Sequence, residues 1–423
     1  MESSYKEIIK LQSIRGSNAK QAFVKEHSLD NWFTQFLYYA LNPLFTYNVS
    51  EKTLSNLDVP DGELALFDSI FECCDYLSRL RGLDDATLRQ VKLLLKKCEP
   101  EERELYIKLL SKTLRFGITA KSVNKAIPNL IPTWEVQQSF PIDSYPLEPD
   151  TEFWLTQKLN GVRATFYQGR LRGRSGAEFE GLEHITKEIM FAALAGFTLD
   201  GELTLKEKGS LSDNEAFRVA TGIINSDTDD KSGICYTIFD VIPTQFFESN
   251  EKKLGYSVRR LILDELAKSL KDVESVSVLP VLYHGKDQEQ IPILLDKMVE
   301  EDKEGLVVNL DVPYQRKRHR GILKVKRFYT MDLPIVRCEE GTGRLSGTLG
   351  SVVVDFKGNE VNVGTGFSDE QRAAFWNDRD NLVGKLCEVK YKEISSDKKT
   401  GDESLQFPVF VGIRDDKTEV SYG

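Results

Sequence analysis

A cluster of prolines divides this chain into two parts with different hydrophobic periodicities: Pro128, Pro132, Pro141, Pro146 and Pro149 fall within one short stretch. Because proline lacks the amide donor and fixes its own backbone angle, such a cluster interrupts helices and sheets and is typical of a connection between domains. The 423 residues also exceed what one ordinary hydrophobic core accommodates. The sequence therefore predicts two or three domains, with one boundary in this stretch.

Before the prolines, apolar residues recur at helical spacing, as at Phe33, Phe36 and Leu37. We expect an all-α N-terminal domain over residues 1–132. The aromatic stripe that includes Trp32 could suggest base stacking, but aromatic residues at helical spacing usually belong to a core. We therefore interpret Trp32, Phe33 and Phe36 as packing residues.

After the prolines, short strand-like runs alternate with helical patterns from Phe153 onward, which predicts an α+β domain over residues 140–331. Glycine-punctuated strands follow Met331 and predict a small C-terminal β-barrel over residues 332–423. The run GTGRLSG in that segment looks like a dinucleotide-binding loop. No strand–loop–helix unit surrounds it, so we interpret it as a hairpin of the barrel.

The overall charge is negative, with 56 basic and 66 acidic side chains and a formal net charge of −10. This balance argues against a protein that coats nucleic acid with a wholly basic surface. Two segments are nevertheless locally basic: residues 103–125 carry six basic side chains and one acid, and residues 316–327 carry seven and no acid. A polyanion could bind at either segment, although a solvated charged face gives the same pattern.

Other features bear on the cellular compartment. The N-terminal residues contain no apolar stretch before a small-residue cleavage site, and no apolar run approaches the roughly 20 residues that span a bilayer. The six cysteines are scattered and form no CxxC pair. We expect a cytoplasmic protein without a membrane segment, a disulfide framework or structural zinc.

Two predicted strands carry paired charges. Side chains alternate across a strand, so Asp200 and Glu202 should lie on one face of FTLDGELTL, and Lys324 and Lys326 on one face of GILKVKRF. Leu323 and Val325 take the opposite positions on the second strand, which directs the lysines toward solvent or a cleft. Each pair could form a charged site, or simply the wet face of an ordinary sheet.

Lys158 begins the segment KLNGVR, which sits at a turn between two predicted strands. Gly161 in this turn would allow a ligand to approach the backbone closely. A lysine here could act as a nucleophile once its amine has lost a proton. The pattern K-x-N-G is also a common polar turn, and taken alone it leaves both interpretations open.

Six motifs follow one another along the chain: KLNGVR at 158, DGE at 200, YTIFD at 236, EGLVV at 304, LKVK at 323 and RDDK at 414. This ordered set resembles the covalent nucleotidyltransferase superfamily, and specifically the ATP-dependent DNA ligases. The stretch KLLSKTLRFGITAKSVNKAIPNL is similar to the DNA-binding domain of ligases from tailed bacteriophages. The resemblance implies a helical DNA-binding domain, a nucleotidyltransferase (adenylation) domain with antiparallel sheets, and a C-terminal OB-fold barrel that carries RDDK.

The resemblance also implies roles for individual residues. Lys158 would attack the α-phosphorus of ATP, expel pyrophosphate and become Lys158-AMP. The other implied roles are Arg163 and Glu202 at the ribose, Phe239 on the adenine, Lys324 and Lys326 at the α-phosphate, Arg414, Asp416 and Lys417 at the pyrophosphate, Arg174 at the nick phosphate, Glu202 and Glu304 at a divalent ion (Mg²⁺ or Mn²⁺), and Lys112, Arg115, Lys121 and Lys125 on DNA. Phosphoryl transfer needs such converging cations, and paired carboxylates beside a triphosphate need a hard cation.

The reaction implied by the family has three steps: adenylation of the lysine, transfer of AMP to the 5′-phosphate of a nick, and attack by the 3′-hydroxyl with release of AMP. The implied partner is nicked double-stranded DNA, and we expect a monomer that acts alone, without a membrane, in the cytoplasm (the host cytoplasm if the source is a virus). The C-terminal barrel would supply RDDK for the first step and then move, because pyrophosphate and DNA cannot occupy the same space.

One departure from the family pattern leaves alternatives open. Family DNA ligases usually have Asp where this chain has Asn160, and asparagine keeps a hydrogen-bonding carbonyl but loses the charge. The alternatives are an RNA ligase or a capping-type guanylyltransferase of the same superfamily, or a noncatalytic nucleic-acid clamp. A nucleophilic lysine placed among acids argues against the clamp, and the helical domain and RDDK favour DNA. NAD-dependent ligation would need a cysteine-rich zinc module that has no counterpart here.

Overall fold

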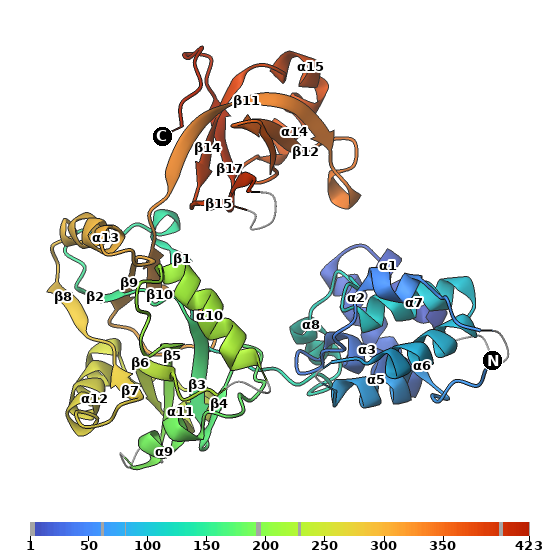
Figure 1. Ribbon diagram of the computed structural model, residues 1–423, viewed down its shortest axis with the longest axis horizontal. Coiled ribbons are helices and arrows are strands. Elements are labelled where there is room, and N and C mark those ends of the chain that lie inside the picture. Colours follow the sequence, from blue (N-terminus) through green and yellow to red (C-terminus); the bar gives the residue numbers. More distant parts are fainter. Residues whose placement is uncertain are drawn as a thin grey trace.

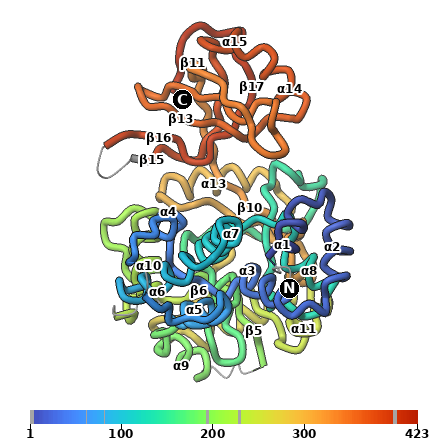
Figure 2. Tube along the Cα trace, turned by 90° about the vertical axis from the view of Figure 1, so that its right-hand side faces the viewer, coloured from blue at the N-terminus to red at the C-terminus, as the bar shows by residue number. Residues whose placement is uncertain are grey.

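The chain folds into three lobes (Figure 1). The computed structural model describes residues 5–60, 63–80, 82–191, 196–226, 230–396 and 401–422. We name the lobes the helical lobe (α1–α8), the central lobe (β1–β10 with α9–α13) and the C-terminal lobe (β11–β17 with α14 and α15). The helical and C-terminal lobes extend from the central lobe in different directions. Figure 2, turned by 90°, shows the C-terminal lobe above the other two.

The helical lobe contains only helices among its described elements. These are α1 (Tyr5–Ser13), α2 (Ser17–Glu26), α3 (Asn31–Leu41), α4 (Glu51–Ser55), α5 (Ile70–Ser78), α6 (Asp85–Lys96), α7 (Pro100–Leu110) and α8 (Ala120–Ala126). Side chains at several helix starts accept a hydrogen bond from a backbone amide of the first turn, as Asp30, Ser50, Ser69, Asp84 and Thr119 do. Such caps satisfy amides that have no partner within the helix and so define where each helix begins.

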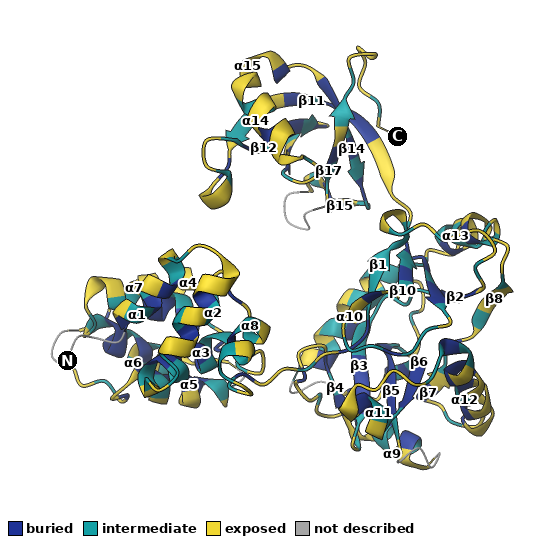
Figure 3. Cartoon of the chain, turned by 180° about the vertical axis from the view of Figure 1, so that it is seen from behind, coloured by how far each residue is buried: buried dark blue, intermediate teal, exposed yellow. Residues whose placement is uncertain are grey.

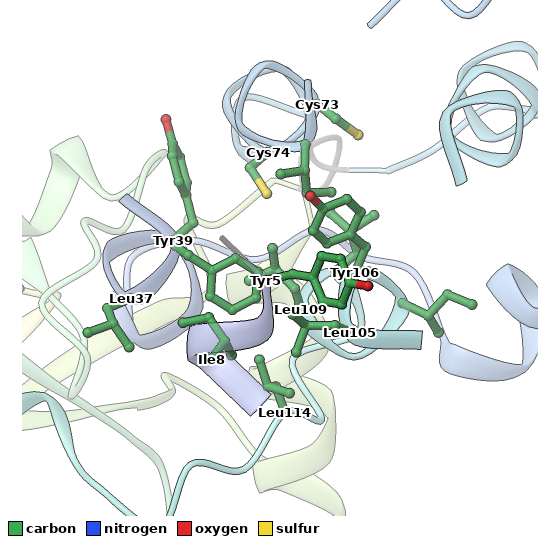
Figure 4. Packing of buried hydrophobic residues seen from close by; sticks show 14 of the residues in the cluster. Tyr5, Ile8, Leu37, Tyr39, Cys73, Cys74, Leu105, Tyr106, Leu109 and Leu114 are labelled. Carbon is green, nitrogen blue, oxygen red and sulfur yellow. The ribbon is translucent and has the colours of Figure 1, made fainter. Parts of the chain in front are cut away.

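The helices pack around one apolar core. Figure 4 shows side chains from α1, α3, α5 and α7 converging there, among them Ile8, Leu37, Cys73 and Leu109, all four fully buried. Phe33 and Phe36 are also fully buried, and Trp32 packs against the same cluster. The interpretation of the aromatic stripe as packing is therefore confirmed. The chain's six cysteines are free thiols, and no helix of the described residues is long and apolar enough to cross a membrane.

The central lobe contains two five-stranded sheets with buried inner strands (Figure 3). In order across the first sheet lie β1 (Gln138–Pro141), β10 (Arg318–Val325), β9 (Leu306–Leu310), β2 (Phe153–Gln157) and β8 (Val281–Gly285). In order across the second sheet lie β4 (Arg170–Arg172), β3 (Val162–Tyr167), β5 (Phe197–Leu205), β6 (Ile234–Pro243) and β7 (Val276–Val278). The antiparallel prediction is confirmed for the inner pairs, whereas the edge pairs β1–β10 and β6–β7 are parallel.

Helices accompany the two sheets of the central lobe. They are α9 (Glu183–Phe191), α10 (Asp213–Asn225), α11 (Thr244–Ser249), α12 (Tyr256–Ser269) and α13 (Gln290–Glu300). The chain leaves the first sheet at the end of β2 and enters the second at the start of β3. The segment KLNGVR therefore bridges the two sheets, and side chains from both sheets can meet around it.

The C-terminal lobe contains an open five-stranded antiparallel sheet. Its order is β13 (Asn359–Val363), β12 (Leu349–Phe356), β11 (Tyr329–Glu340), β14 (Leu386–Tyr391) and β17 (Val409–Ile413). The predicted small β-barrel is found in part: the antiparallel sheet is present, but closure is not found among the described residues, where an isolated bridge between Thr365 and Val409 links the two edges. A short hairpin and two helices complete the lobe: β15 (Ile394–Ser396), β16 (Glu403–Leu405), α14 (Asp369–Asn377) and α15 (Arg379–Leu382).

Candidate active site

A cavity of about 500 Å³ lies between the two sheets of the central lobe. Its walls hold most of the residues that the sequence motifs single out: Lys158, Gly161, Arg163, Arg174, Glu202, Phe239, Lys324 and Lys326. They come from the β2–β3 connection, β3, the turn after β4, β5, β6 and the end of β10. The fold thus brings together segments that are far apart in the sequence.

Lys158 lies at the centre of an ion-pair network in this cavity. Its Nζ donates to Oε2 of Glu304 at 2.5 Å, and Lys326 Nζ donates to the other oxygen of the same carboxylate. The Lys158 side chain is 25% exposed and the Glu304 side chain 9%. Burial raises the pKa of Glu304, but the two lysines outweigh it and hold the pKa below its ordinary value. Glu304 therefore stays ionised and fixes both amines.

Backbone contacts hold the Lys158 segment in place. The Lys158 amide donates to the Gly305 carbonyl at 2.8 Å, which joins this segment to the one that carries Glu304. Gly161 packs directly on β5, where an added Cβ would lie 2.5 Å from the Leu203 carbonyl oxygen. A side chain at position 161 would push the segment away from the sheet, so the glycine permits this close approach.

Arg163 and Asp200 form a second, more deeply placed pair. The Arg163 guanidinium donates to both Asp200 oxygens, at 2.9 and 2.5 Å, and the Tyr314 hydroxyl donates to the same carboxylate at 2.6 Å. Asp200 is fully buried and Tyr314 is 5% exposed. Burial, followed by the Asp200 charge, raises the pKa of Tyr314 well above its ordinary value. Asp200 thus positions Arg163 from the protein interior and does not itself line the cavity.

Phe239 reaches the cavity because β6 contains an irregularity. Asp200 pairs with Asp240, but the next residue, Gly201, pairs with Ile238, so Phe239 is an extra residue on β6. A bulge of this kind re-aims a side chain that would otherwise follow the strand alternation. The Arg163 guanidinium lies 5.4 Å from the centre of the Phe239 ring. An aromatic face and a cation therefore stand side by side in one wall.

Glu202 also lines the cavity, and its environment differs from that of Glu304. The Glu202 carboxylate forms no hydrogen bond or ion pair with any of the described residues. Burial raises the pKa of Glu202 to about 7, although Lys158 and Arg163 oppose this shift. A carboxylate that is costly to ionise and has no partner is suited to receive a cation.

We predict that Glu202→Gln stabilises the protein in a pH-dependent way. The folded pKa of about 7 exceeds the ordinary value of 4.5, so the folded state holds this proton more tightly than the unfolded state. The native protein therefore loses stability as the pH rises from about 4.5 to about 7, and the variant is spared this loss. Thermal unfolding between about pH 5.5 and pH 8 should show an advantage of Glu202→Gln that grows with pH. An advantage that stays constant over this range would contradict the buried, unpaired carboxylate.

The wall of the cavity that β10 contributes is strongly basic. Lys324 and Arg318 come from β10, and the Arg174 guanidinium is held by the Gln138 side chain at 3.0 Å. Burial lowers the pKa of Lys324, and the nearby charges of Arg318 and Lys158 lower it further. Arg318 and Gln138 are thus residues of this wall that the motif analysis missed. Arg318 was visible only as one member of the basic segment 316–327.

The residues predicted at the pyrophosphate are not brought to this cavity. Of the described residues that line it, none belongs to RDDK. Arg414 donates to both oxygens of Asp416, at 2.9 and 2.8 Å, and Lys417 donates to Asp332 on β11 at 2.5 Å. In this arrangement the motif is bound within the C-terminal lobe.

Lys112 has a structural role in this structure, and its contact with DNA stays a prediction. Its Nζ donates to the backbone carbonyls of Tyr39, Ala40 and Asn42, at 3.1 to 3.2 Å. Burial lowers the pKa of Lys112 to about 8. The amine thus satisfies carbonyls at the end of α3 that have no partner within the helix. The other predicted contacts are exposed: Arg115, Lys121 and Lys125.

The sequence analysis missed Asp200 and Tyr314 as the support of Arg163. Asp200 was visible in the DGE motif, but alternation alone placed it beside Glu202 as a second exposed carboxylate. No sequence signal marked Tyr314. Among the described residues there is no group of three or more His, Cys, Asp or Glu side chains placed to hold a metal ion. Of the two predicted metal-associated carboxylates, Glu202 lines the cavity, whereas Glu304 does not line it and contacts the lining residues Lys158 and Lys326.

Comparison with known proteins agrees with this architecture. Residues 121–326 match the family model of the ATP dependent DNA ligase domain, and residues 340–414 match that of the DNA ligase OB-like domain. A DNA ligase of Haemophilus influenzae is 24% identical over 262 residues, which cover 61% of this chain and 87% of the relative. A DNA ligase of Methanoculleus marisnigri is 32% identical over 177 residues, covering 37% of this chain and 32% of the relative.

Solved structures give the same result over nearly the whole chain. Pmar-Lig_PreS3 superimposes with a TM-score of 0.74 and 25% identity, covering 98% of this chain and all of that one. The fold and the site define a nucleotidyltransferase with an appended OB-like domain. The chain belongs to the ATP-dependent DNA ligase family. It is an enzyme that seals nicks in DNA, and the lysyl-AMP mechanism is general to this family.

Proposed function

We propose that this chain seals nicks in double-stranded DNA through Lys158-AMP, with all three chemical steps in the one cavity of the central lobe. The observation that carries this proposal is the sharing of Glu304 by Lys158 and Lys326 at the cavity wall. This contact aims a lysine amine into a site whose other walls hold cations and an aromatic ring. These are the parts that transfer of a nucleotidyl group requires.

In the first step, the Lys158 amine loses a proton, and its Nζ then forms a bond to the α-phosphorus of ATP as the bond to pyrophosphate breaks. Lys324 and Lys326 neutralise charge on the α-phosphate oxygens, which is where charge develops during the transfer. The Phe239 ring supports the adenine. Arg163, held by Asp200, contacts the ribose together with Glu202.

A divalent ion, Mg²⁺ or Mn²⁺, fits the carboxylates of this cavity. Glu202 has no hydrogen-bond or ion-pair partner among the described residues, whereas both oxygens of Glu304 are bound by lysines. Mg²⁺ commonly uses one or two carboxylates and completes its shell with water and phosphate oxygens. We propose that Glu202 would hold the ion and that Glu304 would flank it. When bound with ATP, the ion would neutralise phosphate charge.

In the later steps, AMP passes from Lys158 to the 5′-phosphate of the nick, and the 3′-hydroxyl then displaces AMP. Arg174 would hold the nick phosphate at the mouth of the cavity, where Gln138 orients its guanidinium. Arg414, Asp416 and Lys417 would serve the first step after a movement of the C-terminal lobe toward the cavity. They would orient the departing pyrophosphate.

We propose that the all-α segment 1–132 is a DNA-binding domain, followed by the nucleotidyltransferase domain at 140–331 and an OB-fold domain at 332–423. The exposed side chains of Arg115, Lys121 and Lys125 support this role. Contacts to DNA phosphates release counterions, so nick affinity should fall as salt rises. We expect a monomer to suffice, because the residues proposed for the site come from one chain.

Two lysines of the helical lobe should behave differently when replaced. Lys125→Ala should weaken nick binding and reduce the slope of log affinity against log salt by about one, because one phosphate contact is lost. Lys112→Ala should instead lower the unfolding temperature, because three backbone carbonyls lose their donor at a cost of about 1–3 kcal/mol. Binding titrations at several salt concentrations and thermal unfolding of both variants distinguish these outcomes. A loss of salt slope in Lys112→Ala without destabilisation would contradict the assignment.

The substrate is tested by offering the protein ATP, Mg²⁺ and one of two nicked duplexes. One nick has DNA on both sides of the break, and the other has RNA on both sides. We expect a joined product on the DNA nick, separated on a denaturing gel. Efficient joining of the RNA nick alone would favour the RNA ligase, and binding of nicks without joining would favour the clamp.

A further inference from the structure

One contact between the C-terminal lobe and the central lobe lies beside the cavity, at the segment that joins β14 to β15. Glu393, between β14 and β15, accepts a hydrogen bond from Asn214 Nδ2 to its Oε2 at 2.5 Å. Asn214 lies in the first turn of α10, where the helix dipole favours a negative charge. The Glu393 side chain is 27% exposed, so the contact is partly shielded from water.

This contact continues to the nucleophile segment. Asn160, the residue that departs from the usual family pattern, donates through Nδ2 to Oδ1 of Asn214 at 3.0 Å. Asn160 binds the side-chain oxygen Oδ1 of Asn214, so the side-chain amide group Nδ2 of Asn214 is oriented toward Glu393 and can donate to it. A carboxylate at position 160 could not donate in this way and would compete with Glu393 for the same amide group. The unusual asparagine thus fits a chain of hydrogen bonds that links the segment of Lys158 to the C-terminal lobe.

The same segment brings an additional lysine toward the phosphate-binding side. Lys392 donates to Oε1 of Glu393 at 3.2 Å, so Glu393 both joins the lobes and orients Lys392. Lys392, Lys324 and Lys326 line a second cavity of about 380 Å³ between the two lobes, with Phe328 and Phe407 as apolar walls. Burial lowers the pKa of Lys326, and the charges of Lys158 and Lys392 lower it further against the opposing effect of Glu304.

The chemistry of this second cavity fits a sugar–phosphate backbone. Its three lysines face three carboxylates, with Asp143 in the same wall and Glu393 and Glu304 nearby. Asp143 also binds Lys390 and Glu304 also binds Lys158, so the lysines around the cavity outnumber the carboxylates. Cations beside apolar surfaces suit phosphates that are joined to sugars. Lys390 strengthens the junction, since it donates to Asp143 at 3.2 Å and lies 4.6 Å from the centre of the Phe328 ring.

The arrangement also separates two sets of residues. It places Lys392 beside the phosphate-binding lysines, while Arg414 and Lys417 are bound by Asp416 and Asp332 within their own lobe. Of the described residues that line either cavity, none comes from RDDK. The contact between Asn214 and Glu393 therefore favours a state in which Lys392, and not RDDK, serves the site.

We propose that Asn214 and Glu393 form a latch that adds Lys392 to the active site for the two nick-joining steps, where it binds the DNA backbone next to the break. This inference rests on the proposed function, because it assigns a lobe arrangement to steps of that reaction. Lys392 is the binding residue, and Asn214 and Glu393 are positioning residues. The latch must open for adenylation, so weakening it should slow joining without slowing the formation of Lys158-AMP.

The first test compares Glu393→Ala with Glu403→Ala. Glu403 is a matched control, because it forms an ion pair with Lys357 within the C-terminal lobe. Each protein is assayed for labelling by ATP and, separately, for single-turnover sealing of a DNA nick that already carries 5′-AMP. We expect Glu393→Ala to slow sealing by about tenfold, the effect of losing one hydrogen bond to a charged group, and to be labelled at least as fast as the native protein. Glu403→Ala should match the native protein in both assays.

The second test reverses the polarity of the latch. Asn214→Asp places two carboxylates against each other and should slow sealing of the adenylated nick. Adding Glu393→Gln to Asn214→Asp supplies an amide donor to the new carboxylate, which can still accept from Asn160, and should restore sealing. Lys392→Ala should slow sealing to a similar extent as Glu393→Ala, again without slower labelling.

The outcomes separate the latch from the proposed function. If the native protein is not labelled by ATP, the proposed function fails, whatever the variants do. If the native protein is labelled and seals nicks, native-rate sealing by Glu393→Ala overturns the latch. Equal slowing of both assays, or no recovery when Glu393→Gln is added to Asn214→Asp, also overturns it.

Discussion

Replacing Lys158 by alanine is expected to abolish labelling of the protein by ATP and to reduce nick sealing with ATP by about 10⁴-fold or more, the scale for removal of a nucleophile. The amine is the atom proposed to bond to the α-phosphorus, and the other cavity lysines, Lys324 and Lys326, are held in different positions. The measurement is incubation with Mg²⁺ and α-labelled ATP, followed by denaturing separation. The label must survive denaturation to count as covalent.

Lys206→Ala is a suitable control for this experiment. Lys206 is an exposed lysine that pairs with Glu274 at 2.7 Å, away from the residues that line the cavity. It should be labelled like the native protein, and thermal unfolding should show that both variants are folded. Labelling that persists in Lys158→Ala would assign the nucleophile to another residue.

Removing the carboxylate of Glu304 should produce the second largest loss. Glu304→Ala leaves Lys158 and Lys326 without their shared counter-charge in a largely buried site. Loss of this positioning should slow adenylation by roughly 10²-fold. Breaking a buried ion pair from one side should also lower the free energy of unfolding by about 3–5 kcal/mol. The rate of lysyl-AMP formation, measured at saturating ATP, tests this expectation.

Glu248→Ala controls for the loss of a carboxylate as such. Glu248 is exposed and accepts hydrogen bonds from Tyr167 and Gln168 outside the cavity. Its replacement should leave adenylation at the native rate. Adenylation of Glu304→Ala at the native rate would show that the carboxylate does not position the nucleophile.

Local sequence patterns were sufficient for most strands of the central lobe but not for their assignment to sheets. The run SVSVLPVLY reads as one strand, yet it forms β7 in the second sheet and β8 in the first. Pro280 separates the two, because it has no amide to continue a ladder. Hydrophobic alternation reports that a segment is extended, whereas its partner depends on contacts far away in the sequence.

Helix α14 in the C-terminal lobe shows a signal that was present but not used. Ser368 and Gln371 form a capping box at its start, and the pattern S-x-x-Q can be read from the sequence. The short strands around it dominated the interpretation. The open sheet could not be predicted either, because closure depends on the pairing of edge strands and not on the composition of each strand.

The sequence was sufficient to predict which residues belong to the candidate site, but not how deeply each is buried or which partners it contacts. Motif order gave Lys158, Glu202 and Glu304. The fold places Lys158 and Glu202 in the cavity wall and Glu304 against Lys158. Burial and contacts could not be predicted, because strand alternation assigns a side chain to one face of the sheet but does not show which residues cover that face. Asp200 is therefore a support for Arg163, and Lys112 is a cap for α3. Neither role leaves a mark in local sequence.

The most direct test of the central claim follows the AMP group itself. Native protein is adenylated with α-labelled ATP and freed of nucleotide. One portion is digested, and its peptides are mapped by mass spectrometry. The other portion is mixed with nicked DNA and Mg²⁺ without ATP. The predicted result is a label on Lys158 that passes to the 5′ end of the nick and leaves as AMP while the strands become joined. A label on another residue, or a label that stays on Lys158 while joining proceeds, would contradict Lys158 as the donor of AMP.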